Sequence, residues 1–408
     1  MLQQVINWQR SNPYPLYWML RRVKPLVNIS RYDLWFATKY DDVKRVLSDY
    51  DYFSSDFRRA FSDAELDPSS KISLIASDPP IHTKLRGLVT RAFTPRAVAN
   101  LEGRIAELTH EIIHPLRQEG RMDLISDLAY PLPVMVIAEM LGVPAKDRAD
   151  FKIWSDMLVK SADQIFAERG DDGEAMRRER EGLPPTLVGG MGPYFKDIIA
   201  QRRAEPKDDL ISALVAAELD GEKLSEWDLL DFCSLLLVAG NVTTTNLIGN
   251  AVQCFLDHPE ALSAVREDRS LLQGAIEEVL RYRSPVQFMF RVSTQETELG
   301  GRKVAANQRV IALIGSANRD ESKFTDANRF DIHRSPNPHI AFGHGVHYCL
   351  GAPLARLEAR VVLDIMLDDL HDWQRIGCGS LPPGDSVILH GVKTLPFGFR
   401  SEKRHVAA

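Results

Sequence analysis

One cysteine stands among the residues of this chain that are best able to do chemistry. Residues 342–351 read Phe-Gly-His-Gly-Val-His-Tyr-Cys-Leu-Gly, and the cysteine is Cys349. A thiolate is stabilised by backbone N–H groups at the start of a helix, and the apolar residues at 354, 357, 361 and 362 predict a helix just after it. Gly343 and Gly345 allow a tight loop beneath a flat cofactor, on which Phe342 can pack. The pattern predicts that Cys349 binds a metal as a thiolate at a helix entrance.

These ten residues resemble the haem-binding signature of the cytochrome P450 superfamily, which fixes five positions. Here they are Phe342, Gly345, His347, Cys349 and Gly351. An isolated cysteine between glycines is more often a buried structural residue, but agreement at all five positions favours the metal ligand. The resemblance implies that Cys349 is the axial ligand of haem b. It also implies a mainly α fold with small β-sheets (α+β), in which the haem lies between a long central helix and the cysteine loop.

The long central helix is predicted between Ser225 and Asp257. This stretch has no proline, opens with the capping-box-like Ser225-Glu226-Trp227-Asp228 and is followed by Pro259. About 32 residues at a rise of 1.5 Å give a helix roughly 48 Å long. Such a helix can cross a whole domain.

Within this helix, the segment Ala239-Gly240-Asn241-Val242-Thr243-Thr244 resembles the oxygen-binding segment of the family. The resemblance makes Thr243 the threonine that contacts dioxygen. Small Ala239 and Gly240 would let the helix backbone approach the haem face, and the glycine and threonines predict weakened helical bonding and a local groove. The alternative is that Thr243 only hydrogen-bonds a carbonyl one turn earlier.

Val242 departs from the family pattern, because an acid usually stands just before that threonine. Reduction of dioxygen to water consumes protons, and valine can neither carry nor relay one. We expect delivery through Asn241, Thr243 and Thr244 with ordered water, or through another route. Three interpretations stay open: a tolerated change in a monooxygenase, an enzyme that loses reducing equivalents as peroxide, or a relative of the fungal nitric oxide reductases. The first is favoured.

Glu278 and Arg281 lie three residues apart in a predicted helix and can pair. Their order in the chain resembles the family's Glu-x-x-Arg pair, which braces the cysteine loop together with a downstream Arg or His. Arg329 and His333 are the candidates for this third member, and the sequence does not decide between them.

The two carboxylates of a buried haem need cations and hydrogen bonds. The resemblance places four such residues in the expected order, which are His82, Arg86, Arg291 and His339. With them, the predicted cofactor site comprises Phe342, Gly343, His347 and Gly351.

An apolar substrate pocket is expected from the family's pocket positions, and it implies a lipophilic small molecule. The lining residues would be Leu74, Val238, Ala239, Val242, Val286, Phe288 and Leu389. Each of them is as readily an ordinary core residue. The polar stretch 56–76 and the charged loop 168–185 bracket helices that form a mobile lid in related proteins.

Composition fits a large globular protein, with 408 residues, 44% of them hydrophobic, and a formal net charge of −6. This charge argues against a nucleic-acid binder. Because no linker or repeat divides the chain, one domain over residues 1–408 is expected. Four cysteines without CxxC spacing indicate neither disulfides nor zinc and suit the cytoplasm. The N-terminus lacks a long apolar span, so we expect no membrane anchor, and we expect a monomer.

The favoured function is a haem-thiolate monooxygenase that inserts one oxygen atom from O2 into a lipophilic substrate by hydroxylation or epoxidation. The resemblance to soluble bacterial members implies electrons from a ferredoxin or flavodoxin-type donor with its reductase, so NAD(P)H would act indirectly. A nitric oxide reductase would instead bind NADH directly, with Arg58, Arg59 and Lys71 as a cationic entrance. A haem-based sensor without turnover is the non-enzymatic alternative.

The remaining sequence predicts mostly helix. Helices are expected at 98–117, 131–141, 149–166, 193–203, 208–219, 260–266 and 271–282. Short strands are expected at 35–37, 309–313 and 387–389, and Gly300-Gly301 predicts a hairpin turn.

Overall fold

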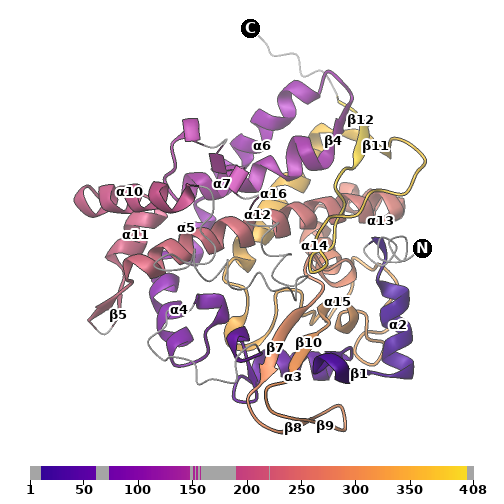
Figure 1. The fold of residues 1–408 in the computed structure, drawn as a ribbon. Helices are drawn as coiled ribbons and strands as arrows, with labels where there is room; N and C mark the ends of the chain where they lie inside the picture. The colour runs from indigo at the N-terminus through magenta and orange to yellow at the C-terminus, as the bar shows by residue number, and fades with distance from the viewer. Residues whose placement is uncertain are drawn as a thin grey trace.

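The computed structural model describes residues 11–60, 73–147, 150, 151, 153, 154, 157, 190–219 and 221–401. Most of the helix predicted at 149–166, the loop 168–185 and Lys71 therefore lie outside the described residues. Figure 1 shows that helices make up most of the molecule, with several small sheets at different places around them. The expected mainly α fold with small β-sheets is confirmed.

Helix α12 (Glu226–Asp257) crosses the middle of the molecule (Figure 1). It has 32 residues and begins with a full capping box, in which Ser225 and Asp228 bond each other's backbone N–H groups. It is apolar and long enough to span a membrane, but 61% of its most apolar window is buried inside the protein. It is therefore the central core helix that the sequence predicted.

Other helices surround α12 and bury it. Those in contact with it are α7 (Pro131–Met140), α10 (Met191–Ala204), α11 (Leu210–Ala216), α13 (Pro259–Glu267), α14 (Leu271–Tyr282) and α16 (Ala352–Asp369). The other named helices are α2 (Tyr14–Val23), α3 (Tyr40–Ser48), α4 (Ile81–Ala92), α5 (Pro95–Ala99), α6 (Glu102–Leu116) and α15 (Ile314–Ala317). A large apolar core lies around α12, and a smaller one lies against the main sheet.

The main sheet has five strands in the order β1-β2-β10-β7-β3. They are β1 (Leu26–Ile29), β2 (Leu34–Ala37), β3 (Phe53–Ser54), β7 (Met289–Ser293) and β10 (Arg309–Ala312). The β2–β10 pair is parallel and the other pairs are antiparallel. A second sheet joins β4 (Arg121–Asp123), β11 (His371–Arg375) and β12 (Pro396–Arg400), and β5 (Glu218–Leu219) pairs with β6 (Glu222–Lys223).

The predicted hairpin at Gly300-Gly301 is confirmed. These two glycines connect β8 (Thr297–Leu299) to β9 (Arg302–Val304), and both have positive φ angles, as a two-residue turn between twisted strands requires. The helix predicted at 98–117 is divided between α5 and α6, and the one at 208–219 ends at Ala216 because β5 follows.

The strand predicted at 387–389 is wrong. Only an isolated bridge between Leu389 and Val286 forms there. The backbone N–H groups of Ile388 and Leu389 both donate to the hydroxyl of Ser386 at 3.2 Å. A serine that captures nearby N–H groups in this way competes with strand pairing.

Candidate active site

The loop that carries Cys349 has the backbone that its glycines predicted. Gly343 and Gly345 have φ angles of +76° and +74°, a region that favours glycine. At Gly345 a Cβ would also lie only 2.7 Å from the Cα of Ser48, so a larger residue would push this loop off α3. The backbone N–H of Cys349 closes the loop by donating to Phe342 O at 2.9 Å.

Cys349 precedes α16, as predicted, and its thiol is accessible. Burial by the surrounding protein raises the pKa of the thiol, while N–H groups of Gly351 and Ala352 and the charges of Arg86 and Arg356 act in the opposite direction. Each of these opposing groups stabilises a thiolate. These groups would support the thiolate when a metal cation binds the sulfur.

Glu278 and Arg281 form a buried ion pair, and neither side chain is exposed. Two parallel bonds of 2.8 and 2.7 Å join Arg281 to the carboxylate. The rest of the guanidinium donates to three backbone carbonyls, those of Asn318, Ala327 and Arg329. This pair therefore fixes the backbone that leads into the cysteine loop, because each of its groups is satisfied.

The third member of this brace is Arg334, so both sequence candidates are wrong. Arg334 Nε lies 3.2 Å from Glu278 Oε2. The exposed Arg329 contributes only its backbone oxygen, and His333 follows a turn in which its own N–H bonds Asp331. The backbone turn before Arg334 decides which side chain points inward, and sequence spacing did not reveal it.

A second brace was missed by sequence reasoning. Glu277 accepts two hydrogen bonds from Arg356, at 2.6 and 2.8 Å, and one involving His339 Nε2 at 2.9 Å. Burial pushes the pKa of Glu277 upward, but the bonds from Arg356 and His339 outweigh it and hold the pKa at about 2. Arg356 also covers the ring of Phe342 at 4.5 Å. The available signal was a second acid beside Glu278 and an arginine in the helix after the cysteine.

His339 was expected to contact a cofactor carboxylate, and the structure gives it other partners. Its Nε2 faces Glu277, and its Nδ1 accepts a bond from the N–H of Ala341 at 3.3 Å. Because both ring nitrogens are engaged, His339 acts as part of the second brace.

His82, Arg86, Arg291 and His347, in contrast, gather at one polar site. The rings of His82 and His347 have centroids 4.1 Å apart. The buried atoms His82 Nδ1, His82 Nε2 and His347 Nε2 have no hydrogen-bond partner in the part of the chain that the structure describes. Burial and the neighbouring cations lower the pKa of His347 to about 3, and burial lowers the pKa of Arg291 to about 10. Buried donors without acceptors indicate a site for an anionic group.

The accessible stripe of α12 is mostly apolar, and Thr243 is its polar member. Ala239 is exposed, and Val238, Val242 and Thr243 are half-buried. Thr243 Oγ1 donates to Ala239 O at 2.5 Å, which was the alternative interpretation of this residue. The predicted break in helical bonding is wrong, because α12 stays a regular α-helix from end to end.

Gly240 and Asn241 were expected to belong to the oxygen-binding site, but neither side of the helix on which they lie is this accessible stripe. A Cβ at Gly240 would lie 2.4 Å from Ile137 Cδ1, so its small size serves the packing of α7. Asn241 is fully buried, and its Oδ1 lies 3.4 Å from the hydroxyl of Thr245, which donates to Ala129 O. The helical turn of about 100° per residue places Asn241 nearly opposite Ala239, so this side chain is directed away from the site.

The predicted pocket residues come together only in part. Val286 and Leu389 pair across a β-bridge, and Leu74 is buried in the large core. The segment of Leu74 is attached to α12 by Ser73, whose hydroxyl donates to buried Asp231 at 2.7 Å. Phe288 packs instead with Tyr14, Tyr17 and Leu313, which form a separate small cluster.

Comparisons with known proteins agree with this geometry. Residues 3–371 match the family model described as Cytochrome P450. The chain is 46% identical over 388 residues to "Cytochrome P450 109" of Bacillus spizizenii, covering 95% of this chain and 92% of that protein. The solved structure of cytochrome P450 CYP109Q5 from Chondromyces apiculatus is 42% identical, with a TM-score of 0.84 and 97% of both chains covered. This chain belongs to the cytochrome P450 family.

A further solved structure is informative about ligands. CYP109E1 from Bacillus megaterium, in complex with testosterone, is 38% identical, with a TM-score of 0.82, and the match covers 95% of this chain and 99% of that one. By membership this P450 is an oxidoreductase, a monooxygenase that binds haem b.

The residues present fit haem b. Its two carboxylates can accept the bonds that His82 and His347 leave unused, beside buried Arg291. Cys349 would supply the thiolate that this family uses on the iron. Arg86 donates to Tyr348 O at 2.7 Å and so connects α4 to the cysteine loop.

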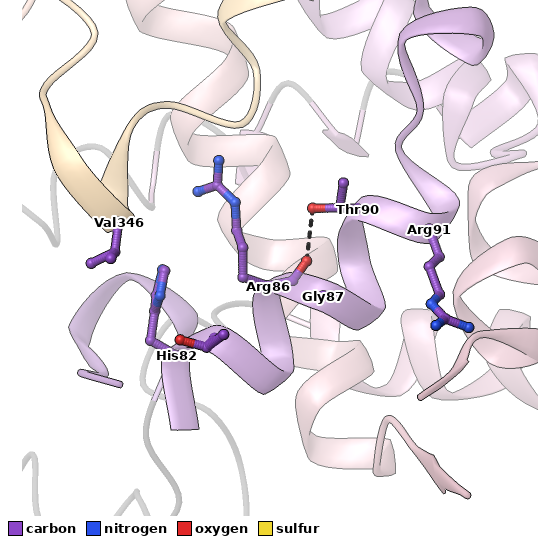
Figure 2. A pocket seen from close by; sticks show the side chains of 7 residues that line it. His82, Arg86, Gly87, Thr90, Arg91 and Val346 are labelled. Atoms are coloured by element: carbon purple, nitrogen blue, oxygen red, sulfur yellow. Dashed lines mark hydrogen bonds between the residues drawn. The ribbon is translucent and has the colours of Figure 1, made fainter. Parts of the chain in front are cut away.

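A pocket of about 420 Å³ lies between α4 and this loop. Figure 2 shows His82 and Arg86 of α4 beside Val346 of the loop, with Arg91 farther along α4. The pocket lies at the surface on the cysteine side, where Tyr348 is 41% exposed.

Proposed function

We propose that this P450 inserts one oxygen atom of O2 into a lipophilic small molecule, by hydroxylation or epoxidation. The observation that carries the proposal is the apolar stripe of α12, formed by Leu235, Val238, Ala239 and Val242, none of which offers a charge to a substrate. Apolar clefts bind apolar ligands by burying their surface. The testosterone complex of a relative supports the same substrate class.

The chain's own residues have separate tasks in this reaction. Bound through Cys349, haem b supplies the redox chemistry of dioxygen. Cys349 is the ligand, and His82, Arg86, Arg291 and His347 orient the cofactor. The apolar stripe positions the substrate and keeps bulk water away from it. A hydroxylation then balances as RH + O2 + 2 electrons + 2 protons giving ROH + H2O.

Electrons come from a separate ferredoxin or flavodoxin-type donor with its reductase, so NAD(P)H acts indirectly. The surface pocket beside Arg86 and Arg91 is where such a donor would approach Cys349 most closely (Figure 2). Acidic electron carriers complement this cationic surface. Four unpaired cysteines support a reducing, cytoplasmic setting.

The test combines purified holoprotein with a surrogate ferredoxin, its reductase and a library of steroids and other lipophilic compounds. We expect several compounds to shift the optical spectrum of the haem and at least one of them to yield an oxygenated product. Spectral binding without product under any donor would support the sensor alternative and overturn this proposal.

The nitric oxide reductase alternative loses one of its three cations. Arg58 donates two bonds to the Asp56 carboxylate, at 2.8 and 2.7 Å, and these bonds raise the pKa of Arg58. An arginine already neutralised by a carboxylate is a poor site for NADH phosphates. Consumption of NADH with nitric oxide and no partner protein would restore that alternative.

A further inference from the structure

Polar side chains follow one face of the second half of α12, which is otherwise apolar. They are Thr243, Asn246, Asn250 and Gln253, at spacings of three, four and three residues. At 3.6 residues per turn these positions fall within about 80° of one another, and they span about 15 Å along the helix. Each gap of three or four residues brings neighbouring side chains within reach of one shared water molecule.

A glycine leaves space for the side chain of Asn246, which lies in the inner part of this polar stripe. Asn246 lies against Gly391, where a Cβ would come within 2.0 Å of Asn246 Oδ1. Gly391 has no positive φ angle that would by itself require glycine. The contact with Asn246 is therefore the reason for the small residue, and the chain keeps a polar amide next to Thr243.

The middle of the stripe has hydrogen-bonding capacity that the protein does not use. Asn250 is fully buried, and its Nδ2 donates to Arg283 O at 2.9 Å and to His390 O at 3.0 Å. Its Oδ1 has no partner among the described residues, and neither has Arg283 Nε. Buried polar atoms of this kind are usually satisfied by internal water. Asn250 and Arg283 thus indicate a water site inside the protein.

The outer end of the stripe reaches the surface. Gln253 Oε1 accepts a bond from Arg283 Nη2 at 3.0 Å, and Arg283 Nη1 lies 3.7 Å from Asp257 Oδ2. The side chain of Asp257 is 63% exposed and therefore in contact with bulk water. At the inner end, Thr243 donates to Ala239 O, which leaves its oxygen as an acceptor for a proton-bearing water.

We propose that Asn246, Asn250 and Gln253 position a file of water that conducts protons from Asp257 to Thr243, in place of an acid at Val242. This inference rests on the proposed monooxygenase function, in which each turnover consumes two protons with two electrons from the donor and releases one water. The amides are positioning residues, because they hold the water that carries the protons.

The test measures product formed per NADH consumed in Asn246→Val, with Asn250→Leu as a second variant. We expect a fall of about tenfold or more in this ratio, since loss of proton delivery usually costs at least that much. Ser234→Ala is the matched control, because Ser234 is buried on the same helix, on the opposite face, and only donates to Leu230 O. It should leave the ratio unchanged.

A rescue separates proton delivery from a structural role. Adding Val242→Asp to Asn246→Val should recover most of the lost ratio, because the carboxyl would supply protons locally. Failure of rescue in a well-folded double variant would overturn the inference. An unchanged ratio in both single variants would overturn it as well.

A crystal structure of the holoprotein gives a readout that does not depend on turnover. We expect ordered water within hydrogen-bond distance of Asn250 Oδ1 and Arg283 Nε, and loss of the water next to position 246 in Asn246→Val. A dry stripe would overturn the inference even if the enzyme is active. If the wild type forms no product while the water is present, the proposed function fails and the water file stands.

Discussion

Around Cys349 the braces are made of charged, paired side chains, whereas the accessible stripe of α12 has mostly small, apolar ones. Glu278 with Arg281, and Glu277 with Arg356, fix the cysteine loop through short bidentate bonds. The stripe beside Thr243 has no comparable network among the described residues. A buried charge network tolerates little change, because removal of one partner leaves the other uncompensated. We therefore expect the loop to tolerate substitution less well than the stripe.

Breaking the charged side should have the largest effect. Arg281→Ala leaves buried Glu278 without its bidentate partner and three backbone carbonyls without their donor, and it should cost about 3–5 kcal/mol of folding free energy. We expect little soluble protein with bound haem. Urea unfolding and the haem content of the purified protein measure the effect.

Arg329→Ala is the control for this prediction. Its side chain is exposed and only its backbone oxygen contacts Arg281, so stability should change by less than about 0.5 kcal/mol. If Arg329→Ala proved as damaging as Arg281→Ala, the assignment of Arg334 as the third member of the brace would be wrong.

Glu358 in α16 extends the comparison, because it is buried and its Oε2 has no hydrogen-bond partner among the described residues. Burial raises the pKa of Glu358 to about 8. The native state therefore keeps a proton that the unfolded chain has lost, and stability should fall as pH rises from about 4.5 to 8, on the order of 1 kcal/mol per pH unit at most.

Glu358→Gln should remove this slope, because the amide imitates the protonated acid. Thermal unfolding at a series of pH values in wild type and variant tests it. Parallel curves for the two proteins would show that Glu358 is ionised in the native state and that an unseen partner stabilises it.

The sequence predicted the cysteine loop with the helix after it, the helix α12 and the Glu278–Arg281 pair because each depends on local spacing. Residues whose roles depend on how distant segments meet were assigned less well. His339 turned out to serve Glu277, and Gly240 serves Ile137, since both contacts come from elements far away in the chain. Arg334 replaced the two candidates because a backbone turn, not spacing, directs its side chain inward. The polar site of His82 and His347 was found because two motifs each placed one member of it.

On the apolar side, Gly240→Ala should lower the folding stability by a smaller amount, and a second substitution should reverse the sign of this change. The new methyl would overlap Ile137 Cδ1, which costs about 1–3 kcal/mol, against a gain in helix propensity of up to about 1 kcal/mol. We expect a net loss of stability. In an Ile137→Val background the contacted atom is absent, so the same change should become neutral or stabilising. Equal losses in both backgrounds would mean that Gly240 is needed for another reason.

Val242→Glu should have the smallest effect, and it tests whether α12 already has a working route for protons. If water along Asn246 and Asn250 already delivers protons, a carboxyl at this half-buried position adds a parallel route. The product formed per NADH should then rise by less than about tenfold. In the control variant Val242→Gln, the new side chain is as large as glutamate but has no carboxyl proton to donate. Any fall in product per NADH that both variants share therefore reflects the size of the side chain alone. A rise of a hundredfold in Val242→Glu would contradict the comparison, because it would mean that α12 lacks a working proton route and that valine is a defect of this P450.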